Sequence, residues 1–419
     1  MLTMAEKIVA RAAGRETVLP GEYVTVSPTY TVCQEISWGP RKRIMQQAGC
    51  TTLKRPEKVV MVVDHTTSAS MGTPYYQAHR EMQDFARETG ARFYGPGSGL
   101  RHLVMTENGF AKPGDLIFSD EPNIATVGVV GALNIAMSSE VVVSQLTDEN
   151  WMMVPRSVRF NLHGKLPAGV MTRDLVQVII RDFAQTDLLS QACIEYAGPA
   201  IAGLSLDERQ SLLACSYHAG ADSALMPVDE LALAYARERG GADIEPISSD
   251  VGAHYDYEHD YDLSAIEPMI SPPPELHNAV AAASLAGLKI DQAALGSCAN
   301  SRLDDMRAAA EILRGRTIAP HVTFYITPGS REVYASAARE GLLEIFMQAG
   351  ATVLAPGCTT CWGYEGFLNP GEVQLSTHQM NYHGRNGSRE ARSYLSSPYV
   401  VAAAAVAGQV VDPRTLLAS

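Results

Sequence analysis

Short apolar runs alternate with amphipathic stretches along most of the chain. Residues 59–63 form a short apolar run rich in β-branched side chains, which predicts a buried strand, and residues 115–118 and 141–143 read similarly. Residues 172–184 and 206–220 have apolar positions at helical spacing. This alternation predicts an α/β fold in which helices cover parallel-rich sheets.

The same alternation is clearest in the last third of the chain. A strand near 293–296 leads to a helix over 302–314, and a strand at 322–326 leads to helical residues up to about 348. A further strand is predicted at 352–355. Polar and sulfur-bearing residues follow each of these strands, and ligands of open α/β sheets bind at the carboxyl ends of strands.

The length of 419 residues predicts more than one domain. The run Pro272-Pro273-Pro274 is stiff and cannot be helical, and a weaker boundary falls near Pro155. We therefore expect three α/β domains, at residues 1–155, 156–274 and 275–419.

Composition narrows the class of protein. Hydrophobic residues make up 46% of the chain, enough for large cores, and the net charge of −13 disfavours nucleic acid and anionic membranes as partners. The N-terminus predicts no signal peptide, and no apolar run reaches the ~20 residues that span a bilayer. The odd number of cysteines, 7, is typical of a reducing, cytoplasmic compartment.

Three cysteines are candidates for a metal centre. Cys358 and Cys361 form a C-x-x-C pair, and Cys298 lies about 60 residues earlier, each just after a predicted strand. Three thiolates can hold a four-iron cluster and leave one iron open to act as a Lewis acid. A redox pair or a structural zinc site are the alternatives, although a zinc site would need a fourth close ligand. The other cysteines are read as buried apolar residues.

Several motifs, in order along the chain, resemble those of the aconitase and isopropylmalate isomerase family. The segment from Gly296 to Arg302 looks like the family's Gly-Ser-Cys-Thr-Asn-x-Arg, and Cys358-x-x-Cys361 looks like its second cluster motif. The remaining matches are Asp64-His65, Gly97-x-Gly99-x-x-His102, Asn381-Tyr382-His383-Gly384-Arg385 and Ser396-Ser397-Pro398.

The resemblance implies three α/β/α domains around a [4Fe–4S] cluster held by Cys298, Cys358 and Cys361. It also implies a small swivel-domain subunit that supplies a fourth domain and a serine base. The expected reaction dehydrates and rehydrates a 2- or 3-hydroxy di- or tricarboxylate. His102, paired with Glu121 or with Asp64-His65, is the expected acid.

Other residues are expected to bind substrate. Arg302 and Arg385 could each fork onto a carboxylate, although Arg302 could instead simply sit in the first turn of its helix. Asn300 either caps that helix or holds the substrate. Gln34 aligns with a family loop that contacts substrate.

The chain also departs from the family pattern. The family's Asp-Ser-His-Thr loop aligns with the segment starting at Glu121, so Asn123 replaces a histidine. His218 stands where the family has a glutamate, and Met380 where it has an arginine. These changes favour a substrate other than isopropylmalate as an alternative: a methylmalate, homoaconitate or a phosphorus-containing malate. A non-catalytic cluster protein that senses iron or binds RNA is the alternative from another class.

Two further patterns are assigned no function. The acidic run around Asp250–Asp262 could bind a metal but is typical of a solvated loop. The Gly97-x-Gly99 pair lacks the third glycine of a dinucleotide fingerprint.

Overall fold

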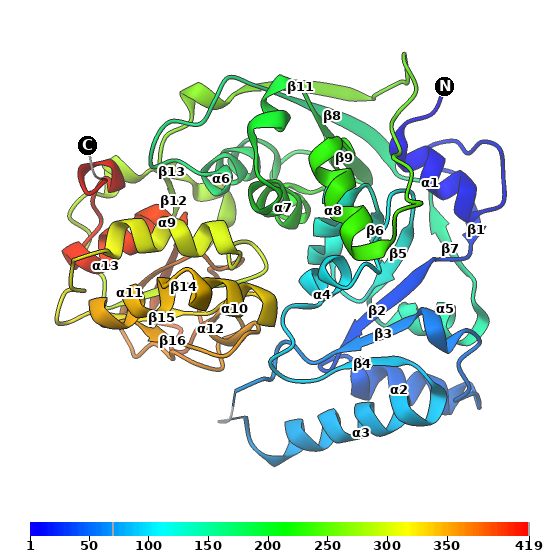
Figure 1. Cartoon of the computed structure of the whole chain (residues 1–419), viewed down its shortest axis with the longest axis horizontal. Helices are drawn as coiled ribbons and strands as arrows, with labels where there is room; N and C mark the ends of the chain where they lie inside the picture. Colours follow the sequence, from blue (N-terminus) through cyan, green and yellow to red (C-terminus); the bar gives the residue numbers. More distant parts are fainter. Residues whose placement is uncertain (69–70, 418–419) are drawn as a thin grey trace. The chain divides into compact units, whose positions relative to one another are not determined.

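The computed structural model describes residues 1–68 and 71–417 (Figure 1). The chain divides into two compact units, each built from three separate segments. Unit 1 comprises Met1–Asp64, Gly72–His163 and Thr186–Tyr261, and unit 2 comprises His65–Met71, Gly164–Gln185 and Asp262–Ser419. The expected division into three domains stays a prediction. The chain crosses between the two units several times, so neither unit is one continuous segment.

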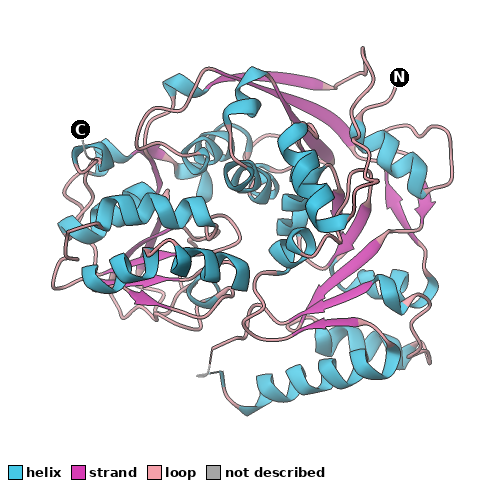
Figure 2. Cartoon of the chain, viewed as in Figure 1, coloured by secondary structure: helices cyan, strands magenta, loops and turns pink. Residues whose placement is uncertain are grey.

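A five-stranded parallel sheet forms part of unit 1. Its strand order is β4-β3-β2-β5-β6. The strands are β2 (Tyr30–Gln34), β3 (Val59–Val62), β4 (Arg92–Tyr94), β5 (Leu116–Ser119) and β6 (Leu133–Ala136). All four residues of β3 and of β5 are buried, which explains their uninterrupted apolar sequence and confirms the strands predicted there. Helices α2 (Trp38–Gln47) and α3 (Thr73–Thr89) pack beside it (Figure 2).

The prediction of a strand at residues 141–143 is wrong. These valines begin helix α5 (Val141–Thr147), in which Val141 and Val142 are buried while Val143 is 39% exposed. Three β-branched residues in a row mimic a strand, but they also fit one half-buried helical turn. The neighbouring strand is β6, which the sequence analysis did not single out.

A four-stranded sheet, in the order β10-β9-β8-β11, forms the second sheet of unit 1. Its strands are β8 (Arg156–His163), β9 (Ala192–Ala197), β10 (Ser223–Leu225) and β11 (Tyr257–Asp262), and β8, β9 and β10 run parallel. The helix predicted over 206–220 is shorter: α7 (Leu206–Ala214) is followed by a 3-10 turn that ends at Gly220. Ser205 caps α7 in a reciprocal pair of hydrogen bonds with Glu208.

Unit 1 also contains the N-terminal helix and a two-stranded ribbon. Helix α1 (Met4–Ala12) buries Met4, Ile8 and Val9. Strands β1 (Tyr23–Val26) and β7 (Asn150–Met153) form an antiparallel two-stranded ribbon.

Unit 2 contains a seven-stranded sheet in the order β13-β12-β18-β17-β14-β15-β16. Its strands are β12 (Met269–Ser271), β13 (Val280–Ala281), β14 (Gln292–Leu295), β15 (Thr323–Ile326), β16 (Thr352–Val353), β17 (Val373–Ser376) and β18 (Arg392–Ser396). Helices α9 (Leu303–Leu313), α10 (Arg331–Arg339) and α11 (Leu342–Ala349) follow in the predicted alternation, so the elements expected there are confirmed. The alanine-rich helix α13 (Pro398–Ala407) is buried in the core of this unit.

Helix α6 (Thr172–Phe183), predicted from its apolar spacing, is packed into unit 2. Gln177 Nε2 donates to the carbonyl of Leu395 at 2.7 Å, and Asp174 accepts a hydrogen bond from the Met269 N–H at 2.8 Å. Residues 164–185 therefore belong structurally with the last third of the chain.

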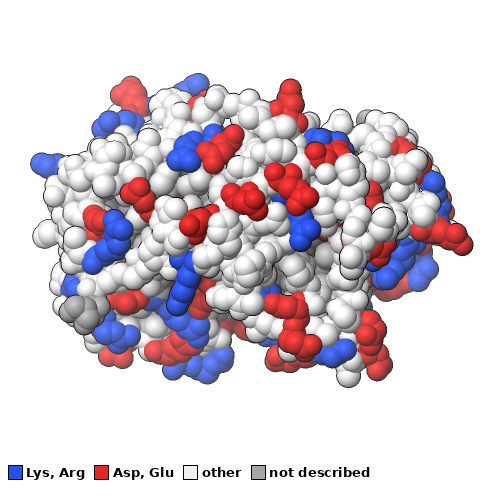
Figure 3. Space-filling model, turned by 90° about the horizontal axis from the view of Figure 1, so that it is seen from above, with Lys and Arg blue, Asp and Glu red and all other residues white. Residues whose placement is uncertain are grey.

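Among the described residues, no helix is both long and apolar enough to cross a bilayer. On the face shown in Figure 3, acidic and basic side chains are interspersed over the surface. Binding to a phosphate backbone instead favours a continuous basic field.

Candidate active site

The three candidate ligand cysteines lie at one edge of the seven-stranded sheet. Cys298 follows β14. After β16, Cys358 is the N-cap of the short helix α12 (Thr359–Trp362), and Cys361 lies within that helix. Strands β14, β15 and β16 are parallel neighbours, so the loops after them meet at their carboxyl ends. The three side chains are 8%, 5% and 1% exposed, and all are free thiols.

The surroundings of Cys361 favour its thiolate. A hydrogen bond from Cys358 and the positive charge of Arg385 help to hold the pKa of Cys361 well below its usual range. The same hydrogen bond, burial and the charges of Cys361 and Cys298 raise the pKa of Cys358, so the three sulfurs lie within electrostatic reach of one another. Buried, mutually close sulfur donors beside a cation fit an iron–sulfur cluster.

The backbone of these loops is closely packed. Gly296 has φ of +131°, and a Cβ there would lie 2.5 Å from the carbonyl oxygen of Thr327. The hydroxyl of Thr327 hydrogen-bonds that of Thr359 at 2.8 Å, which joins the loop after β15 to the C-x-x-C segment. The glycine that precedes Ser297-Cys298 is therefore required by a close approach between loops.

Arg302 supports the Cys298 loop from within the protein. Its side chain is fully buried, and its guanidinium donates to the carbonyls of Ala299 at 2.8 Å and Cys298 at 3.1 Å. Arg302 is also the N-cap of α9, which corrects the expectation that Asn300 caps this helix. Asn300 instead donates to Asp305 at 2.9 Å.

We predict that Arg302→Met weakens retention of the expected iron–sulfur cluster. Two buried carbonyls would lose their donors, and each unsatisfied group costs about 1–3 kcal/mol. The rate of iron release to a chelator, measured anaerobically, should rise severalfold. Arg314→Met, an exposed change at the other end of the same helix, is the matched control. Equal release rates for the two variants would contradict this role.

A second cluster in unit 2 surrounds the ring of Trp362. The guanidinium of Arg385 lies 4.8 Å from the centre of this ring and donates through Nε to the Cys361 carbonyl at 2.8 Å. The ring of His65 meets Trp362 edge-on, with centroids 5.1 Å apart. The structure thus brings two predicted site residues, His65 and Arg385, beside the C-x-x-C segment.

Tyr382 also contacts the guanidinium of Arg385. The guanidinium lies 5.7 Å from the Tyr382 ring centre and donates to its hydroxyl at 3.2 Å. Held between Trp362 and Tyr382, Arg385 is fixed in direction and partly exposed, as binding of an anion requires. Met380, five residues earlier, is partly exposed in the same loop.

The predicted site residues of unit 1 are organised by an arginine that the sequence analysis overlooked. Arg101 is 1% exposed and ion-pairs with Asp64 at 3.2 Å and with Glu121. The same guanidinium donates to Gln34 Oε1 at 2.6 Å and lies 3.8 Å from the carboxylate of Asp120. Arg101 therefore holds Gln34, Asp64 and Glu121, which lie at the end of β2, after β3 and after β5 of the five-stranded sheet.

The remaining predicted residues of unit 1 lie on helical turns. His102, 2% exposed, is in helix α4 (Arg101–Glu107). Asn123, 9% exposed, donates to the Glu121 carboxylate at 3.2 Å. His218 is partly buried in the 3-10 turn after α7, with its ring against Tyr217.

Two residues that shape these clusters, Arg101 and Trp362, had only weak signals in the sequence. Arg101 occupies the variable position immediately before His102, where the motif specifies no residue type. Trp362 directly follows the second cysteine of the C-x-x-C pair, and an aromatic residue there reads equally well as core.

Comparisons with known proteins agree with this arrangement. The model of the aconitase family (aconitate hydratase) matches residues 6–408. A 3-isopropylmalate dehydratase large subunit from Moorella thermoacetica is 35% identical over 99% of both chains. A probable methanogen homoaconitase large subunit from Methanothermobacter thermautotrophicus is 32% identical over 99% of this chain and 98% of its own.

A solved structure, the holo-form of aconitase X from Thermococcus kodakaraensis, superposes with a TM-score of 0.50 at 12% identity. It covers 85% of this chain and 84% of its own, and it supports the α/β fold. The chain belongs to the aconitase family, and it is an enzyme of the hydro-lyase class. Membership of this family implies an iron–sulfur cluster.

Proposed function

We propose that this chain is the large, cluster-bearing subunit of a [4Fe–4S] hydro-lyase that dehydrates and rehydrates a substituted malate. The observation that supports it most is the meeting of three buried thiols at one sheet edge, where Cys361 is held in a thiolate-favouring environment. Cys298, Cys358 and Cys361 would be the ligands. A four-iron cluster with three thiolate ligands supplies a Lewis-acidic iron with an open position.

The side chains around the thiols have roles that follow from their contacts. Arg385, aligned by Trp362 and Tyr382, would pair with a substrate carboxylate. Arg302 would hold the Cys298 loop, because its guanidinium donates to two carbonyls of that loop. Asn300, tied to Asp305 and 1% exposed, would stiffen the same loop beside the substrate.

The acid–base residues follow the family motifs. His65, set against Trp362, and His102 would be the candidates to give a proton to the departing hydroxyl. In unit 1, Asp64 and Glu121 both pair with the guanidinium of Arg101, which would orient the two carboxylates. Gln34, Asn123 and His218 of unit 1 are proposed as further substrate-binding residues.

We further propose that a small swivel-domain subunit completes the enzyme, as the name "large subunit" of the related dehydratases suggests. The test is to assay the cluster-replete chain with 3-isopropylmalate and related malates, alone and after addition of a candidate small subunit. Activity that appears only with both chains supports the proposal. Turnover by the single chain would show that all the catalytic groups are in this chain.

We predict that Met380→Arg changes the order of substrate preference. An arginine at this partly exposed position would offer a charge-assisted pair to a carboxylate, worth roughly 1.5–3 kcal/mol, whereas methionine offers dispersion only. The variant should gain about tenfold or more in kcat/KM for 3-isopropylmalate relative to less charged malates. The measurement is a ratio of kcat/KM values across the series. An unchanged ratio would show that Met380 does not face the substrate.

A further inference from the structure

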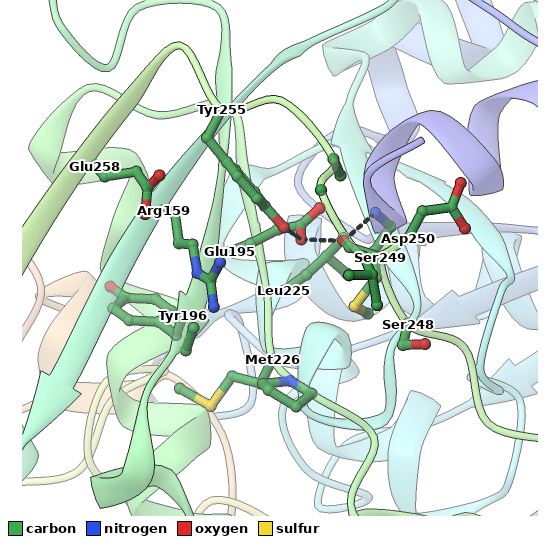
Figure 4. Close-up of a pocket in the computed structure, with 16 residues that line it drawn as sticks. Arg159, Glu195, Tyr196, Leu225, Met226, Ser248, Ser249, Asp250, Tyr255 and Glu258 are labelled. Carbon is green, nitrogen blue, oxygen red and sulfur yellow. Dashed lines mark hydrogen bonds between the residues drawn. The ribbon is translucent and has the colours of Figure 1, made fainter. Parts of the chain in front are cut away.

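A cavity of about 530 Å³ lies in unit 1, against one face of the four-stranded sheet (Figure 4). Its walls come from β8, β9, the end of β10 and the loop of residues 248–255. Met4, Leu225 and Met226 are buried and give it an apolar side, while Arg159, Glu195 and Tyr255 give it a polar one. No lining residue is among the predicted active-site residues.

Within the part of the chain that the structure describes, Arg159, the cationic side chain that lines this cavity, forms no ion pair with a carboxylate. Arg159 stands beside Glu195 in the parallel register of β8 and β9, so both side chains leave the same face of the sheet. The guanidinium stacks on the ring of Tyr255, 5.4 Å from its centre. Its Nε is buried without a hydrogen-bond partner in the described part of the chain. A buried charged donor of this kind favours an added acceptor.

The neighbouring carboxylates are already engaged elsewhere. Glu195, 5% exposed, accepts hydrogen bonds from the Ser249 hydroxyl at 2.6 Å, the Tyr255 hydroxyl at 2.7 Å and the Ala5 N–H at 3.3 Å. Figure 4 shows the bonds of Glu195 and Ser249 on the side of the cavity away from Met226. Asp250 pairs with Lys7 and accepts from the Leu2 N–H. These bonds fix residues 248–255 to α1, so the wall of the cavity is built in advance of any ligand.

The balance of charge restricts the ligand. One guanidinium faces a cavity whose walls also carry the carboxylates of Glu195, Asp250 and Glu258. A dianion such as phosphate would gain one cation and meet several like charges, whereas a monocarboxylate needs one partner only. The apolar side formed by Leu225 and Met226 would remain wet unless the ligand also carries hydrocarbon.

We propose that this cavity is a second binding site, for a small aliphatic monocarboxylate. Its carboxylate pairs with Arg159, and its hydrocarbon body packs on Leu225 and Met226. The site depends on neither the cluster cysteines nor the predicted substrate residues, so it stands independently of the proposed reaction.

The test is isothermal titration calorimetry of the anaerobically purified full chain with 3-methylbutanoate, acetate and inorganic phosphate as separate probes. The expected result is saturable binding of 3-methylbutanoate to one site, several times tighter than binding of acetate. Arg159→Gln should weaken that binding at least about tenfold, and Arg159→Lys should retain part of it. Circular dichroism of each variant reports whether it has folded.

Two control variants assign the site. Arg156→Gln changes an arginine on the same strand but, three residues away, on its opposite face, and it should leave binding unchanged. Arg385→Gln tests whether the probe binds at the proposed active site instead. Binding that is lost in Arg385→Gln and kept in Arg159→Gln would overturn the proposal. Phosphate that binds as tightly as 3-methylbutanoate, or no saturable binding at all, would also overturn it.

Discussion

Replacing Cys358 with serine is expected to abolish the iron–sulfur cluster and the activity together. Cys358 is 5% exposed and shares a hydrogen bond with Cys361, so serine would put a weaker ligand in a site shaped for three sulfurs. The same loss is expected for Cys298→Ser and Cys361→Ser. Anaerobically purified wild-type protein should be brown and contain about four irons per chain. The variants should be colourless, with iron and sulfide near background.

Cys50→Ser is the matched control for these substitutions. Cys50 is partly exposed, and its thiol donates to the carbonyl of Thr52, two residues away, at 3.8 Å. This variant should keep wild-type iron content and colour. If a variant of Cys298, Cys358 or Cys361 kept a full cluster, that cysteine would not be a ligand.

The second large effect is a loss of stability, which we expect for Arg101→Met. Arg101 compensates the carboxylates of Asp64 and Asp120, whose side chains are 2% and 1% exposed, and it also pairs with Glu121. Removing one member of a buried ion pair leaves charge without compensation and typically costs 3–5 kcal/mol. The free energy of unfolding, from anaerobic urea titration, should fall by about that amount. Activity should fall as well, because Gln34, Asp64 and Glu121 lose the group that orients them.

An exposed ion pair between an arginine and a glutamate provides the comparison. Arg307 binds Glu340 at 2.6 Å, with side chains 49% and 36% exposed, and such surface pairs contribute about 0–1 kcal/mol. Arg307→Met should therefore change the unfolding free energy by less than about 1 kcal/mol. Equal losses for Arg101→Met and Arg307→Met would contradict the role assigned to the buried network.

Much of the fold was predictable because single elements carry clear patterns. The buried strand β3, the helix α6 and the alternation from β14 to β16 follow directly from apolar spacing. The valines at 141–143 show the limit of this approach, because a run of three cannot distinguish a strand from one turn of helix. Residues 164–185 pack with unit 2 through long-range contacts such as that of Gln177 with Leu395, which no local pattern reveals.

Site residues that belong to a sequence motif could be predicted. The roles that depend on three-dimensional contacts could not. The three cysteines follow β14 and β16, which lie on either side of β15 in the parallel part of one sheet, so their meeting follows from the α/β rule. Arg302 was left open between two roles, and its two bonds to the Cys298 loop are visible only in three dimensions. The same holds for Arg101, because its partners Asp64 and Glu121 lie 37 and 20 positions away in the sequence.

The most direct test of a three-cysteine cluster is a Mössbauer spectrum of the anaerobically purified chain labelled with ⁵⁷Fe. Three thiolates bind three of four irons, so the spectrum should contain two iron environments in a ratio of about three to one. The minority environment should be the one that oxidation removes. A spectrum of four equivalent irons, or of a two-iron cluster, would contradict the proposal that Cys298, Cys358 and Cys361 hold an open [4Fe–4S] cluster.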